Sequence, residues 1–102
     1  MLELRPICEN CACDLPPESI EARICSFECT FCRHCVEGVL ANVCPNCGGG
    51  FQQRPVRPAK AWRGGVSSAH KPAVTARKHK PVDVETHRAF AADIVGIAPE
   101  KR

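Results

Sequence analysis

The stretch "CSFECTFCRHC", residues 25 to 35, places four cysteines within eleven residues. The pair "CPNC" follows at residues 44 to 47, and Cys8 and Cys11 form an earlier pair with the same spacing. Two cysteines separated by two residues can turn both sulfurs toward one ion, and two such pairs complete a closed tetrahedral zinc site. The dense thiols of this stretch are therefore typical of metal ligands.

All nine cysteines lie in the first half of the chain. Eight of them form four ordered pairs, which are Cys8/Cys11, Cys25/Cys29, Cys32/Cys35 and Cys44/Cys47. This number suffices for two Zn²⁺ ions with four thiolate ligands each. Neighbouring pairs could share an ion, or pairs one and three could interleave with pairs two and four, and spacing alone leaves both arrangements open. Cys13 is left over, and we expect a spare cysteine near the first site rather than a reactive thiol or an alternative ligand.

Metal explains these thiols better than disulfides do. The cysteine count is odd, and Glu3 and Arg5 interrupt the apolar run that a secretory signal needs. No stretch of about 18 apolar residues is present, so we expect no membrane partner and a cytoplasmic, reducing location. With four phenylalanines, one tryptophan and no tyrosine, the chain also lacks a conventional aromatic core. Bound metal must then supply much of the stability.

Charge divides the chain into regions. Residues 1–52 carry three basic and seven acidic side chains, whereas residues 53–102 carry eleven and four. Residues 53–82 contain eight basic and no acidic side chains, with scattered prolines and glycines, which predicts a flexible, largely disordered basic linker. Alternatively, this tail could fold back on the acidic head, against Glu18, Glu21, Glu28 or Glu37. For residues 83–102 we expect a short helix that is capped by Asp83, followed by a C-terminal tail.

Within residues 1–52, two elements are predicted. "ARICSFECTF", residues 22–31, alternates in places like a short strand or hairpin, and residues 35–42 place Val36, Val39 and Leu40 at helical spacing. We expect the remaining apolar side chains to pack around the metal sites; they are Ile7, Leu15, Ile24, Phe27 and Phe31.

The ligand order, "CTFC" with Phe31 before Cys32, the apolar helix after Cys35, and "CPNC" with Pro45 resemble a RING finger. This resemblance implies a small metal-stabilised α+β fold, a RING-like or treble-clef zinc module with one short hairpin and one short helix. It also implies an interleaved cross-brace. One site would then be Cys8, Cys11, Cys32 and Cys35, and the other Cys25, Cys29, Cys44 and Cys47, with Cys29 where many RING fingers have histidine.

A closer resemblance covers about residues 1–59. "MLELRP", "DLPPES", "EARICSFECTFC", "VCPNCGG" and "RPVRPA" are similar to a family of small bacterial proteins called domain of unknown function 1272. The resemblance implies a bacterial, cytosolic zinc-binding protein with no established activity.

RING-type ubiquitin ligases hold their conjugating enzyme with an aliphatic residue between the first two ligands, a proline after the seventh, and commonly a basic residue after the eighth. Here Glu9 and Asn10 fill the first gap and Gly48 follows the last ligand, so only Pro45 matches. Closed four-thiolate sites also leave no open position for catalysis. We therefore expect no catalytic residues and a non-enzymatic protein-interaction or adaptor module, with ligase-like activity the less favoured reading.

Nucleic-acid binding through the basic tail is the alternative function. Its candidate contacts are Arg54, Arg57, Lys60, Arg63, Arg77, Lys78 and Lys80, with Trp62 available to stack on a base. His34, between two ligands, could replace one of them, but such a residue more often points to solvent.

Overall fold

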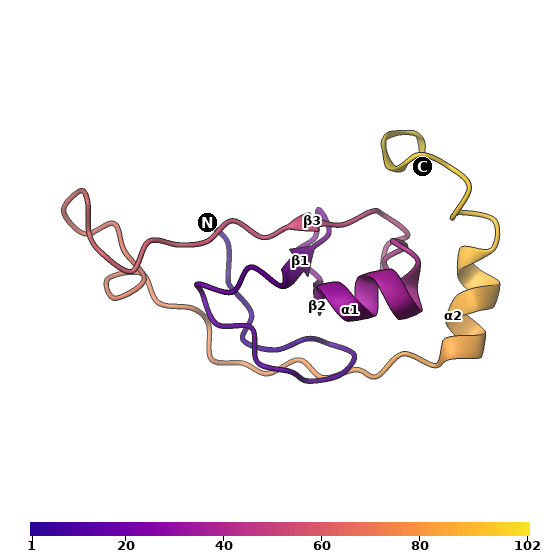
Figure 1. The fold of residues 1–102 in the computed structure, drawn as a ribbon, viewed down its shortest axis with the longest axis horizontal. Helices are drawn as coiled ribbons and strands as arrows, with labels where there is room; N and C mark the ends of the chain where they lie inside the picture. Colours follow the sequence, from indigo (N-terminus) through magenta and orange to yellow (C-terminus); the bar gives the residue numbers. More distant parts are fainter.

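The computed structural model describes all of residues 1–102, in a flattened shape of 47 × 27 × 17 Å. Its helices and strands are short and mostly lie in the first half (Figure 1). In chain order they are β1 (Ala22–Ile24), β2 (Thr30–Cys32), α1 (Arg33–Cys35), the π-helical turn η1 (Val36–Leu40), β3 (Gln52–Gln53), α2 (Val84–Ala91) and the 3₁₀ turn η2 (Pro99–Lys101).

The predicted hairpin at residues 22–31 is confirmed by the antiparallel strands β1 and β2, which pair Ala22 with Cys32 and Ile24 with Thr30. The turn between them is tight because Glu28 has a left-handed backbone (φ 63°) and its N–H donates to the Cys25 carbonyl at 3.0 Å. Strand β3 adds to the other edge of β1, giving the order β2-β1-β3. The hairpin thus carries Cys25 and Cys29 at its turn.

The predicted helix at residues 35–42 is confirmed as the continuous run of α1 and η1. It ends at Ala41 and Asn42, which both have left-handed backbones (φ 51° and 57°) and so turn the chain toward Cys44. The Asn42 side chain accepts a hydrogen bond from the Phe51 N–H at 2.9 Å, which ties this turn to the chain leading into β3.

The core sits between the hairpin and this helix, and the cysteines form part of it. The rings of Phe31 and Phe51 meet edge to face at 5.5 Å between centroids, and Leu15 and Leu40 are buried beside them. The expected packing is confirmed for Leu15 and Phe31, which belong to the cluster that contains the cysteines. Ile7 is buried outside that cluster, and Ile24 is only half-buried. For Phe27 it is wrong: the side chain is 69% exposed because it projects from the hairpin turn.

The expectation of a disordered basic tail is wrong. The chain runs away from the head after β3, turns, and returns along the opposite side of the head to α2 (Figure 1). The return segment, residues 71–82, follows a defined path because its backbone donates to the head: Val74 N–H to the Glu3 carbonyl at 3.0 Å, and Lys80 N–H to the Glu9 carbonyl at 2.8 Å. The amino-acid composition of this segment did not predict its ordered path, because a segment without its own apolar core can still dock through main-chain hydrogen bonds.

The fold-back alternative is therefore right about the path and wrong about the partners. Glu21 pairs with Arg33 of the head at 2.8 Å, and Glu28 accepts from the Glu3 N–H. The return segment makes one ion pair, between the exposed Arg77 and Asp14 at 3.9 Å. Exposed pairs of this kind contribute little, so backbone hydrogen bonds hold the tail.

The predicted C-terminal helix is confirmed as α2, and Asp83 caps it by accepting from the Thr86 N–H at 2.8 Å. The helix packs across η1, where the buried His87 contacts the Leu40 carbonyl through Nε2 at 3.0 Å. Beyond α2, the Arg102 guanidinium donates to the carbonyls of Asn42 and Gly48. The second half of the chain thus contacts the head at its first loop, its helix and its last cysteine turn.

Candidate metal centre

One group of thiols lies where the first cysteine loop meets the end of β2. The sulfur atoms of Cys8, Cys11, Cys13 and Cys32 all lie within 4.8 Å of one another. The Cys11 and Cys32 sulfurs are 3.8 Å apart. Two sulfurs at about 2.3 Å from a tetrahedral zinc are separated by about 3.8 Å, so this pair has the spacing that a bound ion would impose.

The first loop curls tightly enough to bring three thiols to one place. Ala12 has a left-handed backbone (φ 62°), its N–H donates to the Cys8 carbonyl at 2.9 Å, and the Cys8 N–H donates to the Cys13 carbonyl at 3.0 Å. The Cys11 N–H also points to the Cys8 sulfur at 3.5 Å. Cys13 therefore belongs to the group, which the pairwise spacing of the sequence did not indicate.

Cys35, expected as the fourth ligand of this site, is buried next to the group but not within it. Helix α1 carries it, and its sulfur accepts a hydrogen bond from the Asn10 side-chain amide at 3.2 Å. The Asn10 side-chain oxygen Oδ1 in turn accepts from the Val82 N–H of the return segment at 2.8 Å. Five thiols thus surround the first site, and the sulfurs of four of them lie within 4.8 Å of one another.

The second group joins the hairpin turn to the "CPNC" turn. The sulfurs of Cys25, Cys44 and Cys47 lie within 4.8 Å of one another. Cys29, the fourth expected ligand, lies outside this limit but is buried alongside. Burial and the neighbouring thiol of Cys25 raise its pKa, against the lowering effect of the Asn46 side chain. Gly48 closes the turn with a left-handed backbone (φ 79°), from which its N–H donates to the Cys44 carbonyl at 2.8 Å.

The two groups combine the cysteine pairs in an interleaved order. Cys8 and Cys11 of the first pair meet Cys32 of the third, whereas Cys25 of the second meets Cys44 and Cys47 of the fourth. Spacing alone left the sequential order open. The observed grouping fits the cross-brace that the RING resemblance implies.

The thiol pKa values show how crowding affects ionisation without a cation. Burial raises the pKa of Cys8, and burial together with the Cys11 thiol raises that of Cys13 to about 12. Burial also acts on Cys11, but the Cys13 N–H and the thiols of Cys13, Cys8 and Cys32 outweigh it and lower its pKa to about 7. The group favours one negative charge at a time, so a soft divalent cation would be needed to hold four thiolates together.

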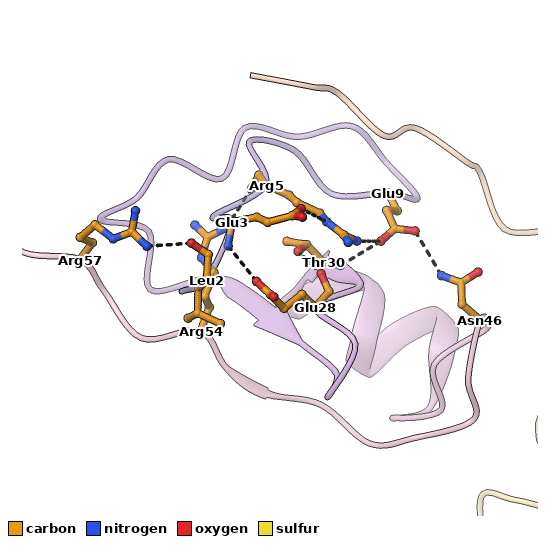
Figure 2. A network of polar contacts seen from close by, with 9 residues as sticks. All are labelled: Leu2, Glu3, Arg5, Glu9, Glu28, Thr30, Asn46, Arg54 and Arg57. Carbon is orange, nitrogen blue, oxygen red and sulfur yellow. Dashed lines mark hydrogen bonds and ion pairs between the residues drawn. The ribbon is translucent and has the colours of Figure 1, made fainter. Parts of the chain in front are cut away.

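A buried carboxylate links the two candidate sites (Figure 2). Glu9, 6% exposed, accepts from the Thr30 N–H at 2.9 Å and from Arg5 at 3.5 Å through one oxygen. Its other oxygen accepts from the Asn46 side chain at 3.2 Å, within the "CPNC" turn. Sequence reasoning treated Glu9 only as the residue in a ligase-contact position. Its structural role had no sequence signal, because the partner Asn46 is 37 residues away.

Two of the expected nucleic-acid contacts have structural partners in the fold. Arg54 is 1% exposed, and its guanidinium donates to the carbonyls of Arg5, Leu15 and Pro16 at 2.8–3.0 Å. Arg57 donates to the carbonyls of Leu2 and Lys71 at 2.7 Å (Figure 2 shows the Leu2 contact). Both guanidinium groups anchor the N-terminal segment, and the burial of Arg54 removes it from the candidate contacts.

The other tail candidates are exposed: Lys60, Trp62, Arg63, Arg77, Lys78 and Lys80. Trp62 is 73% exposed, and the Lys60 ammonium lies 4.5 Å from its ring centroid. The exposed His34 belongs to neither thiol group. None of the helices is long and apolar enough to cross a membrane.

Fold and site together define a small cysteine-rich protein whose head contains two thiol clusters, each able to hold a metal ion. The chain belongs to the family described as "Protein of unknown function (DUF1272)", which matches residues 1–57. An uncharacterized protein of Rhizobium meliloti (strain 1021) is 52% identical over 89 residues, covering 87% of this chain and 99% of that protein. The aligned length exceeds the 57-residue family match, so the similarity extends into the second half. No solved structure matches the chain.

Proposed function

We propose that this protein is a non-enzymatic zinc-binding module that acts as a protein-interaction adaptor, with two structural Zn²⁺ ions holding its head together. The observation that carries the proposal is the interleaved grouping of thiols from four distant parts of the head. The proposed ligands are Cys8, Cys11, Cys32 and Cys35 for one ion, and Cys25, Cys29, Cys44 and Cys47 for the other.

The donor chemistry supports a structural rather than a catalytic role. Catalytic zinc keeps one position for water or substrate and usually has histidine or carboxylate ligands. Here the groups contain thiols alone, and the buried carboxylate of Glu9, between Cys8 and Cys11 in the chain, is engaged with Thr30, Arg5 and Asn46. Zinc supplies rigidity in such a closed site, and the surrounding chain supplies the binding surface.

The return segment also supports an adaptor over a ubiquitin-ligase-like enzyme. The gap between the first two ligands is covered, since Lys80 donates its N–H to the Glu9 carbonyl and Val82 donates to the Asn10 side chain. Pro45 lines a hollow together with Val82 and with Phe90 of α2. A conjugating enzyme could reach this surface only after the second half of the chain had moved away.

A different face offers apolar groups to a protein partner. Phe27 is 69% exposed at the hairpin turn, and it lines a hollow with Ile94, Ile97 and Pro99 of the C-terminal segment. Exposed apolar side chains that cluster in this way are typical of interaction surfaces. Because Cys47 and Gly48 lie on the same rim, the second metal site would fix the shape of this face.

Metal content and partner capture test the proposal in two stages. Elemental analysis of protein purified under reducing conditions should give two zinc ions per chain; fewer than two, or disulfides in their place, contradicts the zinc module. Affinity capture from a bacterial host that encodes the protein should then yield a protein that the Phe27→Ser variant loses. Ile20→Ser is the matched control, because Ile20 is equally exposed (65%) outside the hollow. Equal loss with both variants contradicts the adaptor face.

Nucleic-acid binding is the second candidate, and one observation favours it. Arg77, Lys78 and Lys80 of the return segment line one hollow with Arg5 of the head, so the fold gathers basic groups from both halves. Binding should weaken steeply with salt, with a slope of about −0.9 per phosphate neutralised on a duplex. The triple variant Arg77→Ala/Lys78→Ala/Lys80→Ala should reduce that slope, whereas Arg88→Ala on α2 should not. Absence of any gel shift with DNA or RNA at low salt eliminates this candidate.

A further inference from the structure

The first site has one thiol more than a tetrahedral ion can bind. Cys8, Cys11 and Cys32 are common to the observed group and to the proposed ligand set, but the fourth thiol differs. Cys13 is inside the group and exposed to solvent, whereas Cys35 is buried beside it on α1. The second site has no such surplus, because its four thiols account for the remaining cysteines.

We propose that Cys13 is an alternative fourth ligand of the first site, so that this site exists in two ligand sets that share Cys8, Cys11 and Cys32. In one set Cys35 completes the tetrahedron, and in the other Cys13 does. This inference rests on the proposed zinc module and adds a second, exchangeable binding mode to one of its two sites.

The backbone around Cys13 makes the second set accessible without refolding the head. The left-handed Ala12 and the 3.0 Å hydrogen bond from Cys8 N–H to the Cys13 carbonyl already hold residue 13 against the group. A cysteine without a role at the site would not need a backbone held in this position. Here the thiol is within 4.8 Å of each of the three shared ligands, as a ligand of the same ion must be.

Cys35 has its own partner when it is not a ligand. The Asn10 amide donates to its sulfur at 3.2 Å, and Asn10 is itself held by the Val82 N–H at 2.8 Å. The buried sulfur is thus hydrogen-bonded in the alternative set. The return segment therefore has a direct connection to the choice between the two ligands.

The exchange is a ligand substitution without redox chemistry. The Cys13 thiol loses its proton and forms a metal–sulfur bond, while the Cys35–metal bond breaks and the Cys35 thiolate takes up a proton. The ion keeps four thiolates, and the net charge of the site is unchanged. Cys11 is exposed in both sets, and Cys13 adds a second exposed ligand, so an ion held in the second set is more open to an external thiol or chelator. The second site has one exposed ligand, Cys47, and no means of gaining another.

Cobalt substitution tests the proposal, because Co²⁺ bound by four thiolates and Co²⁺ bound by three have distinct visible spectra. The wild-type chain should bind two Co²⁺ ions, both with the four-thiolate spectrum. Cys35→Ser should keep that spectrum at both sites because Cys13 replaces the missing ligand. The double variant Cys13→Ser/Cys35→Ser should lose it at one of the two sites.

The matched control is Cys29→Ser, which removes a buried ligand at the site that has no fifth thiol; it should lose the four-thiolate spectrum at one site. If the single variant Cys35→Ser also loses the four-thiolate spectrum at one site, the proposal is overturned. A wild-type chain that fails to bind two Co²⁺ ions with four thiolates each contradicts the zinc module itself, so the two failures are distinguishable.

Zinc transfer provides a second measurement if Cys35→Ser does not fold. In the wild-type chain, one of the two zinc ions should pass to a chromophoric chelator faster than the other. Cys13→Ser leaves the set of Cys8, Cys11, Cys32 and Cys35 complete, so the head should still fold, and the fast phase should be lost. Transfer rates that are identical with and without Cys13 overturn the proposal.

Discussion

The two halves of this protein are ordered by different means. The head, residues 1–52, has a core in which cysteines pack with Leu15, Phe31 and Leu40. Its paired strands β1 and β2 have three residues each, and its one helical run covers only Arg33 to Leu40. The second half has no cysteine and few buried side chains, yet it follows one path around the head. Its order comes from individual anchors, such as Arg54, Val82, His87 and Arg102, that reach backbone or side-chain groups of the head.

This difference shows that low hydrophobicity predicts the absence of a core more reliably than the absence of structure. A segment that cannot bury enough apolar surface by itself can still be fixed when a rigid neighbour offers unpaired carbonyls and amides. The comparison also implies a hierarchy, because the second half docks on surfaces that exist only when the head is folded. The following predictions test that hierarchy, from the largest expected effect to the smallest.

Removal of metal should unfold both halves together. Structural zinc contributes an apparent 10–16 kcal/mol or so to small domains at about pH 7, far more than the short elements of this head can supply. Chelation followed by circular dichroism and amide NMR should show loss of signal in residues 1–52 and in α2. A near-native spectrum after complete metal removal contradicts this prediction, and a folded α2 on an unfolded head contradicts the hierarchy.

Acid should release the metal. Burial raises the pKa of Cys8 and of Cys29, so protons already compete for these thiols near neutral pH. Metal binds the thiolate form of these ligands and releases their protons. The stabilisation is therefore fully present above the ordinary thiol pKa of about 8.5 and decreases as the pH falls below it.

Elemental analysis after ultrafiltration at a series of pH values measures this loss. We expect the occupancy to fall as the circular dichroism signal falls, since binding and folding are coupled. Full occupancy down to about pH 4 would be inconsistent with proton competition at raised thiol pKa values.

Arg54→Ala should destabilise the metal-bound protein by about 3 kcal/mol, because it leaves the carbonyls of Arg5, Leu15 and Pro16 without a buried donor. Thermal unfolding at saturating zinc measures the change. The matched control is Arg63→Ala, which removes an exposed guanidinium from the same half and should change the stability by less than about 0.5 kcal/mol. Similar effects for the two variants would show that charge, rather than buried hydrogen bonding, anchors the segment.

His87→Ala should loosen α2 without unfolding the head. The ring Nε2 faces the Leu40 carbonyl at 3.0 Å and so carries the proton that it donates, and the loss of this buried contact costs about 1 kcal/mol. Hydrogen exchange of the α2 amides should speed up while the amides of β1 and β2 are unchanged. Arg88→Ala, on the exposed face of the same helix, is the control, and faster exchange in the strands would contradict local docking.

The sequence by itself determined the local elements and the ligand chemistry. The hairpin at residues 22–31, the helix after Cys35 and the Asp83 cap each depend on neighbouring residues, so a local pattern was enough to predict them. Thiol spacing indicated two metal clusters for the same reason, because two cysteines separated by two or three residues form their turn locally.

Only the tertiary structure decided which pairs meet, that Cys13 joins the first group, and where the second half lies. These outcomes depend on contacts between residues that are far apart in the chain, such as Glu9 with Asn46 and Asn10 with Val82. Sequence spacing carries no information about such contacts. A polar side chain such as Arg54 looks the same in the sequence whether it faces solvent or three buried carbonyls, and only the folded chain distinguishes the two.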